Sequence, residues 1–157
     1  DCIGSFVNEF GEAGARVWLQ RFSSAAKERG GILLRMCRGD TIATEIAINK
    51  AQLMLEEIAI SGASVANIGA CYYLWAHSFA HHIGLFQDPR FLVLDYDAMV
   101  ADPQVAIDRT CHHFSIERLN IDPDYWFAGR CFGKSVEIST RLLAKCEAIY
   151  DEVSHAF

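Results

Sequence analysis

The sequence has no pair of cysteines at the close spacing that zinc sites and redox motifs use. Its cysteines are six in number and lie far apart, at Cys2, Cys37, Cys71, Cys111, Cys131 and Cys146. Most stand among apolar residues, which favours buried thiols in a reducing compartment over a disulfide framework. We therefore expect free, buried cysteines, no metal and a cytoplasmic location.

Positive charge is also scarce. The sequence has 14 Lys and Arg residues and 20 Asp and Glu residues, which gives a net charge of −6. An acidic surface disfavours a long phosphate backbone as partner, so no nucleic acid is expected. The net charge does not exclude the binding of a single small anion in a local basic pocket.

The first residues contain neither a basic nor an apolar segment of the kind found in signal peptides. The chain also starts with Asp1 and not with Met, which indicates that it begins partway through a longer protein. Hydrophobic residues make up 52% of the 157 residues, enough for one folded domain over 1–157.

Helical periodicity accounts for most of the apolar residues. Apolar stripes predict helices over 12–27, from Asp40 or Thr41 to about 60, over 64–86, and over 136–153. The stretch 64–86 is nearly long enough to cross a bilayer, but its asparagine and three histidines favour a buried core helix, so no transmembrane segment is expected.

Two short apolar runs, 32–36 and 91–94, are predicted as buried strands. Each lies between helical segments, and strands spaced by helices indicate a parallel sheet covered on both faces. The expected fold class is therefore α/β, helix-rich, with a sheet that is incomplete at the N-terminus.

The segment that follows the second run carries a recurring pattern. Residues 91–94 lead into Tyr96–Met99, a short turn, Asp102-Pro103 and a helix that ends at Phe114–Ile116. This order resembles the sulfotransferase family, in which a strand runs into Tyr-Glu-Asp-Leu, then Asp-Pro and a helix ending in Phe-Leu-Gly. The resemblance implies a P-loop-like α/β domain, of which the chain is the C-terminal portion.

The segment before Asp40 resembles the family's second nucleotide-binding element, where a strand ends in Arg and is followed by Asp and a helix with a Ser. The bacterial trehalose-type sulfotransferases are nearest; in their register Arg38 and Asp40 match, Ala47 replaces the Ser, and Arg35 is a rival for the Arg role. Phosphate binds well to guanidinium groups and to the amides of a helix start. The residues expected to bind the donor nucleotide are Arg35, Arg38, Asp40 and Thr41.

The family's phosphosulfate-binding loop is missing, because Gly11–Gly14 has no strand before it and no Lys or Arg within it. The family's catalytic base lies in the same early region, so no catalytic residue is assigned. The resemblance implies transfer of a sulfuryl group from 3′-phosphoadenosine 5′-phosphosulfate to a hydroxyl of a carbohydrate or other small acceptor. The alternative is a catalytically inactive sulfotransferase-like domain kept for binding or assembly, and a homodimer stays open.

Other side chains could serve a site. His77 and His81, four residues apart, would share a helix face as zinc ligands do, but no third ligand is apparent and packing or cleft lining is favoured. Core packing is likewise favoured over an acceptor pocket for the aromatic residues Tyr72, Tyr73, Trp75 and Phe79.

Overall fold

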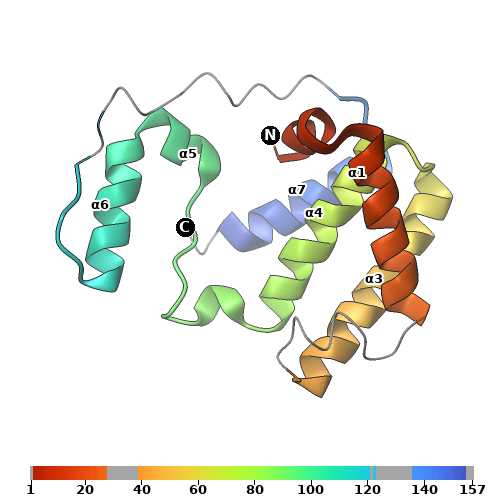
Figure 1. The fold of residues 1–157 in the computed structure, drawn as a ribbon, viewed down its shortest axis with the longest axis horizontal. Helices are drawn as coiled ribbons and strands as arrows, with labels where there is room; N and C mark the ends of the chain where they lie inside the picture. The colour runs from red at the N-terminus through yellow and green to blue at the C-terminus, as the bar shows by residue number, and fades with distance from the viewer. Residues whose placement is uncertain (1, 28–38, 121, 123–135, 155–157) are drawn as a thin grey trace.

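The described part of the chain is built from helices (Figure 1). The computed structural model describes residues 2–27, 39–120, 122 and 136–154. Its elements are α1 (Cys2–Lys27), α3 (Thr41–Ser61), α4 (Val65–His82), the short 3₁₀ helix η1 (Leu85–Gln87), α5 (Tyr96–Ala101), α6 (Pro103–Phe114) and α7 (Thr140–Ser154). No β-strand occurs within these residues.

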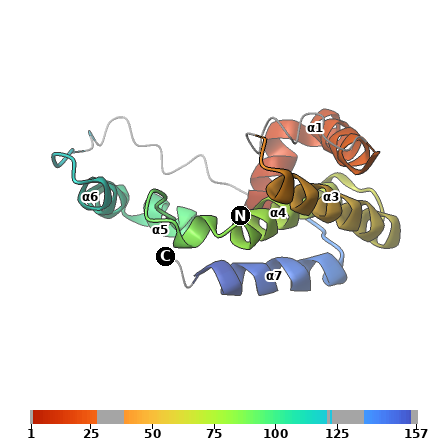
Figure 2. The same ribbon diagram turned by 90° about the horizontal axis from the view of Figure 1, so that it is seen from below.

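Helix α4 lies at the centre of a helical bundle. It packs against α1, α3 and α7, and α1 also packs against α3. Figure 2 shows α1 on one side of α4 and α7 on the opposite side. The buried small residues Gly69, Ala70 and Cys71 let the neighbouring helices come close. A helix enclosed in this way is apolar on most of its circumference, as the sequence prediction of a core helix requires.

Aromatic rings fill the space between α1 and α4. The ring centroids of Trp18 and Tyr72 lie 4.1 Å apart, and those of Phe22 and Trp75 lie 6.3 Å apart. The buried indole N–H of Trp75 donates to the carbonyl oxygen of Ala47 in α3 at 3.2 Å, so this polar atom is satisfied inside the core. The preference for core packing is confirmed for Trp75.

Helix α3 begins after Asp40 and ends at Ser61, close to the predicted bounds of Asp40 or Thr41 and about 60. The carboxylate of Asp40 accepts a hydrogen bond from the amide of Ala43 at 3.0 Å, and the Thr44 hydroxyl donates to the Asp40 carbonyl oxygen. Gly62 ends the helix with φ 89° and ψ 149°. The Asp40 carboxylate thus satisfies one of the free amides at the start of α3, and the Gly62 amide donates to the Ile58 carbonyl oxygen at its end.

Asn67 joins the ends of three helices. Its side-chain nitrogen donates to the carbonyl oxygens of Ser61 and Gly62 at 2.8 and 3.0 Å. Its side-chain oxygen accepts the amide of Ser139 at 3.0 Å. The end of α3, the start of α4 and the segment leading into α7 are therefore held by one buried amide with its hydrogen bonds made.

A buried carboxylate connects α7 to α3. Glu57 is only 7% exposed, and its oxygens accept hydrogen bonds from Arg141 at 2.8 and 3.0 Å and from Lys145 at 2.5 Å. The two hydrogen bonds from Arg141, together with the one from Lys145, lower the pKa of Glu57 to about 2. Glu57 is thus held as a carboxylate at neutral pH.

Helix α1 is longer than predicted. It starts at Cys2, and Gly11 interrupts it with φ 51° and ψ −150°, a conformation that glycine adopts far more readily than other residues. The predicted helix over 12–27 is the part after this kink. The residues before Gly11 are helical although their apolar pattern shows no clear period.

The predicted parallel α/β, P-loop-like sheet is wrong for the described residues. Residues 91–94, predicted as a strand, form no strand, and the other predicted strand, 32–36, lies outside the described residues. A β-strand exists only when a neighbour accepts and donates its backbone hydrogen bonds. Without such a neighbour, the apolar side chains of the described chain are buried between helices instead.

The remaining boundaries follow local capping. Helix α4 ends before Gly84, whose φ of 71° is left-handed, and not at residue 86 as predicted. Asp102 caps α6 and Pro103 is its first residue, which confirms the predicted helix start. Helices α5 and α6 make their main contacts with each other and stand apart from the bundle on the left of Figure 1.

Candidate binding cavity

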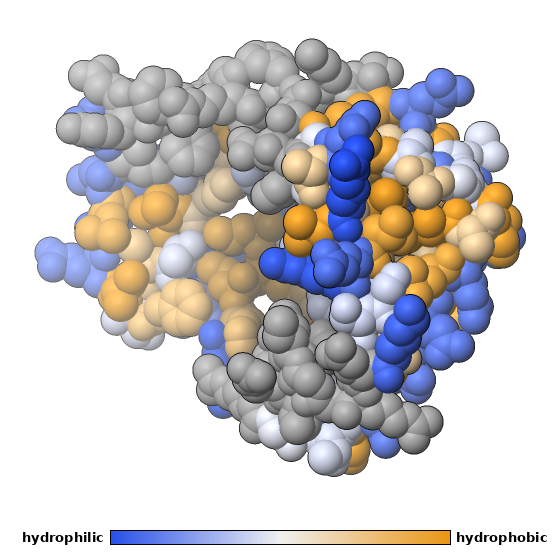
Figure 3. All heavy atoms as spheres, turned by 45° about the vertical axis from the view of Figure 1, so that its right-hand side comes forward, coloured by the Kyte–Doolittle hydropathy of each residue, from blue (hydrophilic) through white to orange (hydrophobic). Residues whose placement is uncertain are grey.

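A cavity of about 360 Å³ opens between α4, α7 and the segment that leads from η1 into α5. Figure 3 shows a hollow between the bundle and the part that carries α5 and α6. Its apolar lining residues are Ile3, Phe86, Val93, Leu94, Cys146 and Val153. A cavity of this volume with several apolar lining residues can hold a small organic molecule.

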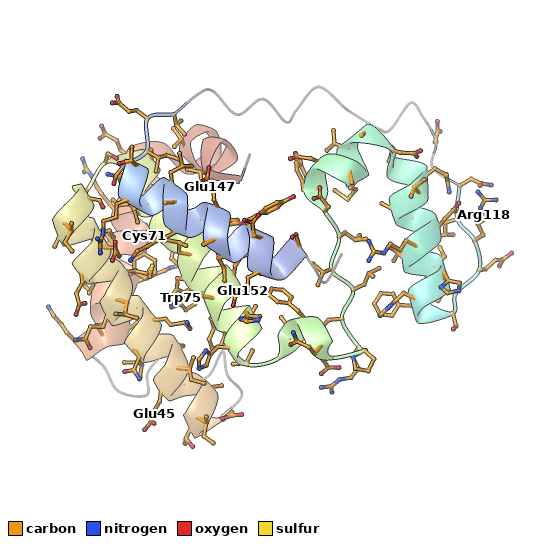
Figure 4. All side chains as sticks on the ribbon, turned by 180° about the vertical axis from the view of Figure 1, so that it is seen from behind. Glu45, Cys71, Trp75, Arg118, Glu147 and Glu152 are labelled. Carbon is orange, nitrogen blue, oxygen red and sulfur yellow. The ribbon has the colours of Figure 1, made fainter. Side chains whose placement is uncertain are left out.

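The polar lining of the cavity is aromatic and acidic. The ring-bearing polar residues are Tyr73, His77, Tyr96 and Tyr150, and the acidic residues are Asp95, Asp97, Glu147 and Asp151. Two of the acidic residues, Glu147 and Asp151, come from α7, on which Figure 4 labels Glu147. No Lys or Arg is among the described residues that line the cavity, so its formal charge at neutral pH is negative.

Two residues that line the cavity, Tyr150 of α7 and Asp95 before α5, are joined by a hydrogen bond. The Tyr150 hydroxyl donates to the Asp95 carboxylate at 2.9 Å. The other carboxylate oxygen accepts the amide of Ala98 at 2.9 Å, so Asp95 also caps α5. The hydrogen bonds from Ala98 and then Tyr150 lower the pKa of Asp95. The same hydrogen bond to Asp95 raises the pKa of Tyr150 above its ordinary value.

The ring of His77 is held against Tyr73. Their ring centroids lie 4.0 Å apart. The Nδ1 of His77 lies 2.9 Å from the carbonyl oxygen of Tyr73; because a carbonyl only accepts, Nδ1 carries the proton. The orientation of this imidazole is therefore set by the helix that bears it. Both rings add a flat, polarisable surface to the cavity wall.

The residues expected to bind a donor nucleotide do not line this cavity. Asp40 and Thr41 lie at the start of α3, where Asp40 caps the helix, and Figures 1 and 2 show the start of α3 apart from the segment that leads into α5. Arg35 and Arg38 lie outside the described residues. Their binding to 3′-phosphoadenosine 5′-phosphosulfate stays a prediction.

The two histidines considered as zinc ligands have different neighbours. His77 bonds to a backbone oxygen, whereas the Nδ1 of His81 lies 4.0 Å from the Glu152 carboxylate. Among the described residues no group of three His, Cys, Asp or Glu side chains is placed to hold a metal ion. None of the described helices is long and apolar enough to cross a bilayer.

Sequence reasoning did not identify Asp95, Glu147 and Tyr150 as neighbours. Asp95 precedes a short helix and is recognisable as a cap. Glu147 and Tyr150 look like solvent-facing residues of an amphipathic helix, and 55 positions separate Tyr150 from its partner Asp95. No local spacing relates two residues so far apart. Of the aromatic residues considered for an acceptor pocket, Tyr73 lines the cavity.

Comparisons with protein-family models, with curated proteins and with solved structures found no significant match to this chain.

Proposed function

We propose that this domain binds a small organic cation in the cavity between α4, α7 and residues 93–97. The observation that carries the proposal is the composition of the lining: four carboxylates, three tyrosines and six apolar residues, with no Lys or Arg among the described lining residues. Carboxylates and aromatic rings together favour an ammonium group bound to an apolar body.

The two parts of such a ligand have separate partners. Its apolar part is desolvated against side chains such as Phe86, Val93 and Leu94, which favours binding in proportion to the buried area. Its charge is attracted to the carboxylates of Glu147 and Asp151 and to the faces of the tyrosine rings. The net charge of −6 adds a long-range attraction for cations.

An anionic ligand is disfavoured in the same cavity. The donor 3′-phosphoadenosine 5′-phosphosulfate carries several negative charges, and the acidic lining repels them. Sulfuryl transfer therefore stays a prediction from the resemblance alone and depends on Arg35 and Arg38, away from the cavity. The proposed role is binding, and no described residue is assigned a catalytic step.

Calorimetric titration with benzyltrimethylammonium tests the proposal. Its neutral carbon isostere, neopentylbenzene, has the same shape without the charge, and we expect it to bind at least about tenfold more weakly, since cation–π and charge contributions together exceed roughly 1.4 kcal/mol. Adenosine 3′,5′-bisphosphate serves as the anionic probe, and we expect no heat from it at the cavity.

Two matched variants of α7 test whether the cation binds next to this helix. Glu147→Gln is expected to weaken cation binding roughly twofold to fivefold, because a solvent-accessible charge pair contributes about 0.5–1 kcal/mol. Glu152→Gln removes a carboxylate that does not line the cavity and is expected to leave binding unchanged. Equal affinity for the cation and its isostere, or equal effects of the two variants, would contradict the proposal.

A further inference from the structure

Helix α3 carries apolar side chains on two opposite faces. Its inner face packs into the bundle through Ala47, Ala51, Met54 and Ile58, all buried. A helix that packs on one side only normally has a polar outer face. The outer face of α3 departs from this rule and has the most exposed large apolar side chain of the described residues, Ile42.

The outer apolar residues form one stripe along the helix. Ile42, Leu53 and Ile60 are 72%, 51% and 65% exposed, and Ile46 lies half-buried between the first two. Figure 3 brings the side with α1 and α3 forward and shows apolar surface gathered there. A run of exposed apolar side chains along one helix face is a feature that interaction surfaces share.

The spacing of the stripe is that of a coiled-coil seam. Positions 42, 46, 49, 53, 56 and 60 follow one another at intervals of four and three residues. At 100° per residue they fall within a sector about 80° wide along a helix roughly 30 Å long. Asn49 and Glu56 are the two polar members. We call these six residues the outer seam.

The charge at the outer seam is acidic. Glu56 lies within it and Glu45 beside it, and both side chains are exposed; Figure 4 shows Glu45 projecting away from the bundle. None of the ion pairs between described residues involves Glu45 or Glu56. The only basic residue of α3, Lys50, is half-buried, and burial lowers its pKa.

These charges disfavour a second copy of the chain as the partner. In a parallel, in-register pair Glu56 would meet its own copy, and in the antiparallel pair centred on α3 it would meet Ile46. Either arrangement buries a carboxylate without a cation, which is strongly unfavourable. Two chains of charge −6 also repel each other. A cationic side chain opposite Glu56 removes this penalty and selects the partner.

We propose that the outer seam of α3 docks an amphipathic helix of a basic partner protein, with Leu or Ile against Ile42, Leu53 and Ile60 and with Lys or Arg opposite Glu56. The apolar contacts supply the affinity, and the pairing of Glu56 sets the register and the choice of partner. Asn49 adds a second polar position that specifies the register. This surface is separate from the cavity, so occupation of one site does not require the other.

Two synthetic helical peptides test the proposal. Both carry Leu or Ile at the seam positions and neutral residues elsewhere; one has Lys at the position that faces Glu56 and the other has Glu there. By fluorescence anisotropy we expect the Lys peptide to bind at least about tenfold more tightly, since desolvated charge pairs contribute several kcal/mol. In the chain with Glu56→Lys the preference of the two peptides is expected to reverse.

Matched variants separate docking from unfolding. Leu53→Asp, at an exposed position of the seam, is expected to abolish peptide binding while the helical circular dichroism stays unchanged. Val105→Asp places the same charge at a position on α6 that is 60% exposed and is expected to have no effect. Failure of Glu56→Lys to reverse the preference, or a dimer of the chain alone that Leu53→Asp dissociates, would overturn the proposal.

Discussion

At the scale of single residues, Glu57 makes the free energy of unfolding depend on pH. Its pKa is lowered from an ordinary value of 4.5 to about 2 by Arg141 and Lys145, so the unfolded chain binds the proton more tightly. The stabilisation is complete above about pH 5 and is lost as the pH falls towards 2. We expect about 1–3 kcal/mol of unfolding free energy to be lost over this window.

Urea denaturation at a series of pH values measures this loss. Glu57→Gln cannot titrate, and its stability should change less between pH 5 and 2 than that of the unchanged chain. Glu56→Gln, which neutralises an exposed neighbour, is the matched control. A Glu57→Gln curve parallel to the unchanged chain would show that the three charges are not coupled in solution.

The buried thiols give a second residue-scale prediction. Burial raises the pKa values of both Cys71 and Cys146 to about 12, so at pH 8 only about one thiol in ten thousand is the reactive thiolate. We expect iodoacetamide to leave both unmodified in the folded chain and to alkylate both in guanidinium chloride. Peptide mass spectrometry measures the extent, and rapid labelling of the folded chain would refute their burial.

Residue roles that depend on local sequence were the predictable ones. Asp40 and Asp102 can be predicted as helix caps because a cap bonds to an amide three residues away. The expectation of free, buried cysteines is confirmed for Cys71, Cys111 and Cys146. The cavity could not be predicted, since the contact of Tyr150 with Asp95 arises only from the packing of α7 beside residues 93–97.

At the scale of elements, two glycines end helices in different ways. Gly62 has φ 89° and ψ 149°, a combination that is nearly exclusive to glycine. Gly84 has φ 71° and ψ 21°, a left-handed conformation that asparagine also adopts. No atom lies within 4 Å of a Cβ built on Gly62, so any cost there is backbone strain.

We therefore expect Gly62→Asn to cost about 1–3 kcal/mol of unfolding free energy and Gly84→Asn to cost less than about 1 kcal/mol. Thermal unfolding followed by circular dichroism compares the two. Equal destabilisation by the two substitutions would mean that the Gly62 backbone relaxes in solution.

Helices were easier to predict than strands for a physical reason. A helix satisfies its own backbone, so the apolar period and the caps at Asp40 and Asp102 suffice to identify it. A strand requires a partner, and the apolar run 91–94 has none among the described residues. Periodicity alone does not distinguish a buried strand from an apolar connection of the same length.

At the scale of the whole molecule, stability is unevenly distributed. Helix α4 has eight buried residues and is enclosed by α1, α3 and α7, whereas Cys111 is the only buried residue of α6. Segments with few buried contacts open at lower free energy. The part with α5 and α6 is therefore expected to open independently of the bundle.

Hydrogen–deuterium exchange tests this expectation. Amides of α6 should exchange at least about tenfold faster than amides of α4, because local opening costs less there by more than roughly 1.4 kcal/mol. Benzyltrimethylammonium should slow exchange around residues 93–101 if it binds the proposed cavity. Equal protection of α4 and α6 would mean that α5 and α6 are docked on the bundle in solution.

The overall chain order of helices was predictable, but their packing was not. The helices over 12–27, to about 60, over 64–86 and over 136–153 were each anticipated from an apolar stripe. Which stripes meet depends on contacts such as Asn67 with Ser139, 72 positions apart. The sheet was predicted from two short apolar runs between helical segments, and the run 91–94 forms no strand.

The indole of Trp75 donates a hydrogen bond from α4 to Ala47 in α3. Its fluorescence can therefore be used to follow the packing of these two helices. A tryptophan shielded from water emits at shorter wavelength than one in solvent, so the contribution of Trp75 to the fluorescence reports whether these two helices are together. Phe79 stacks on it with ring centroids 5.8 Å apart, and separation of α3 would expose the ring edge. Trp75 is thus an intrinsic fluorescent probe for the packing of α3 against α4 in the core.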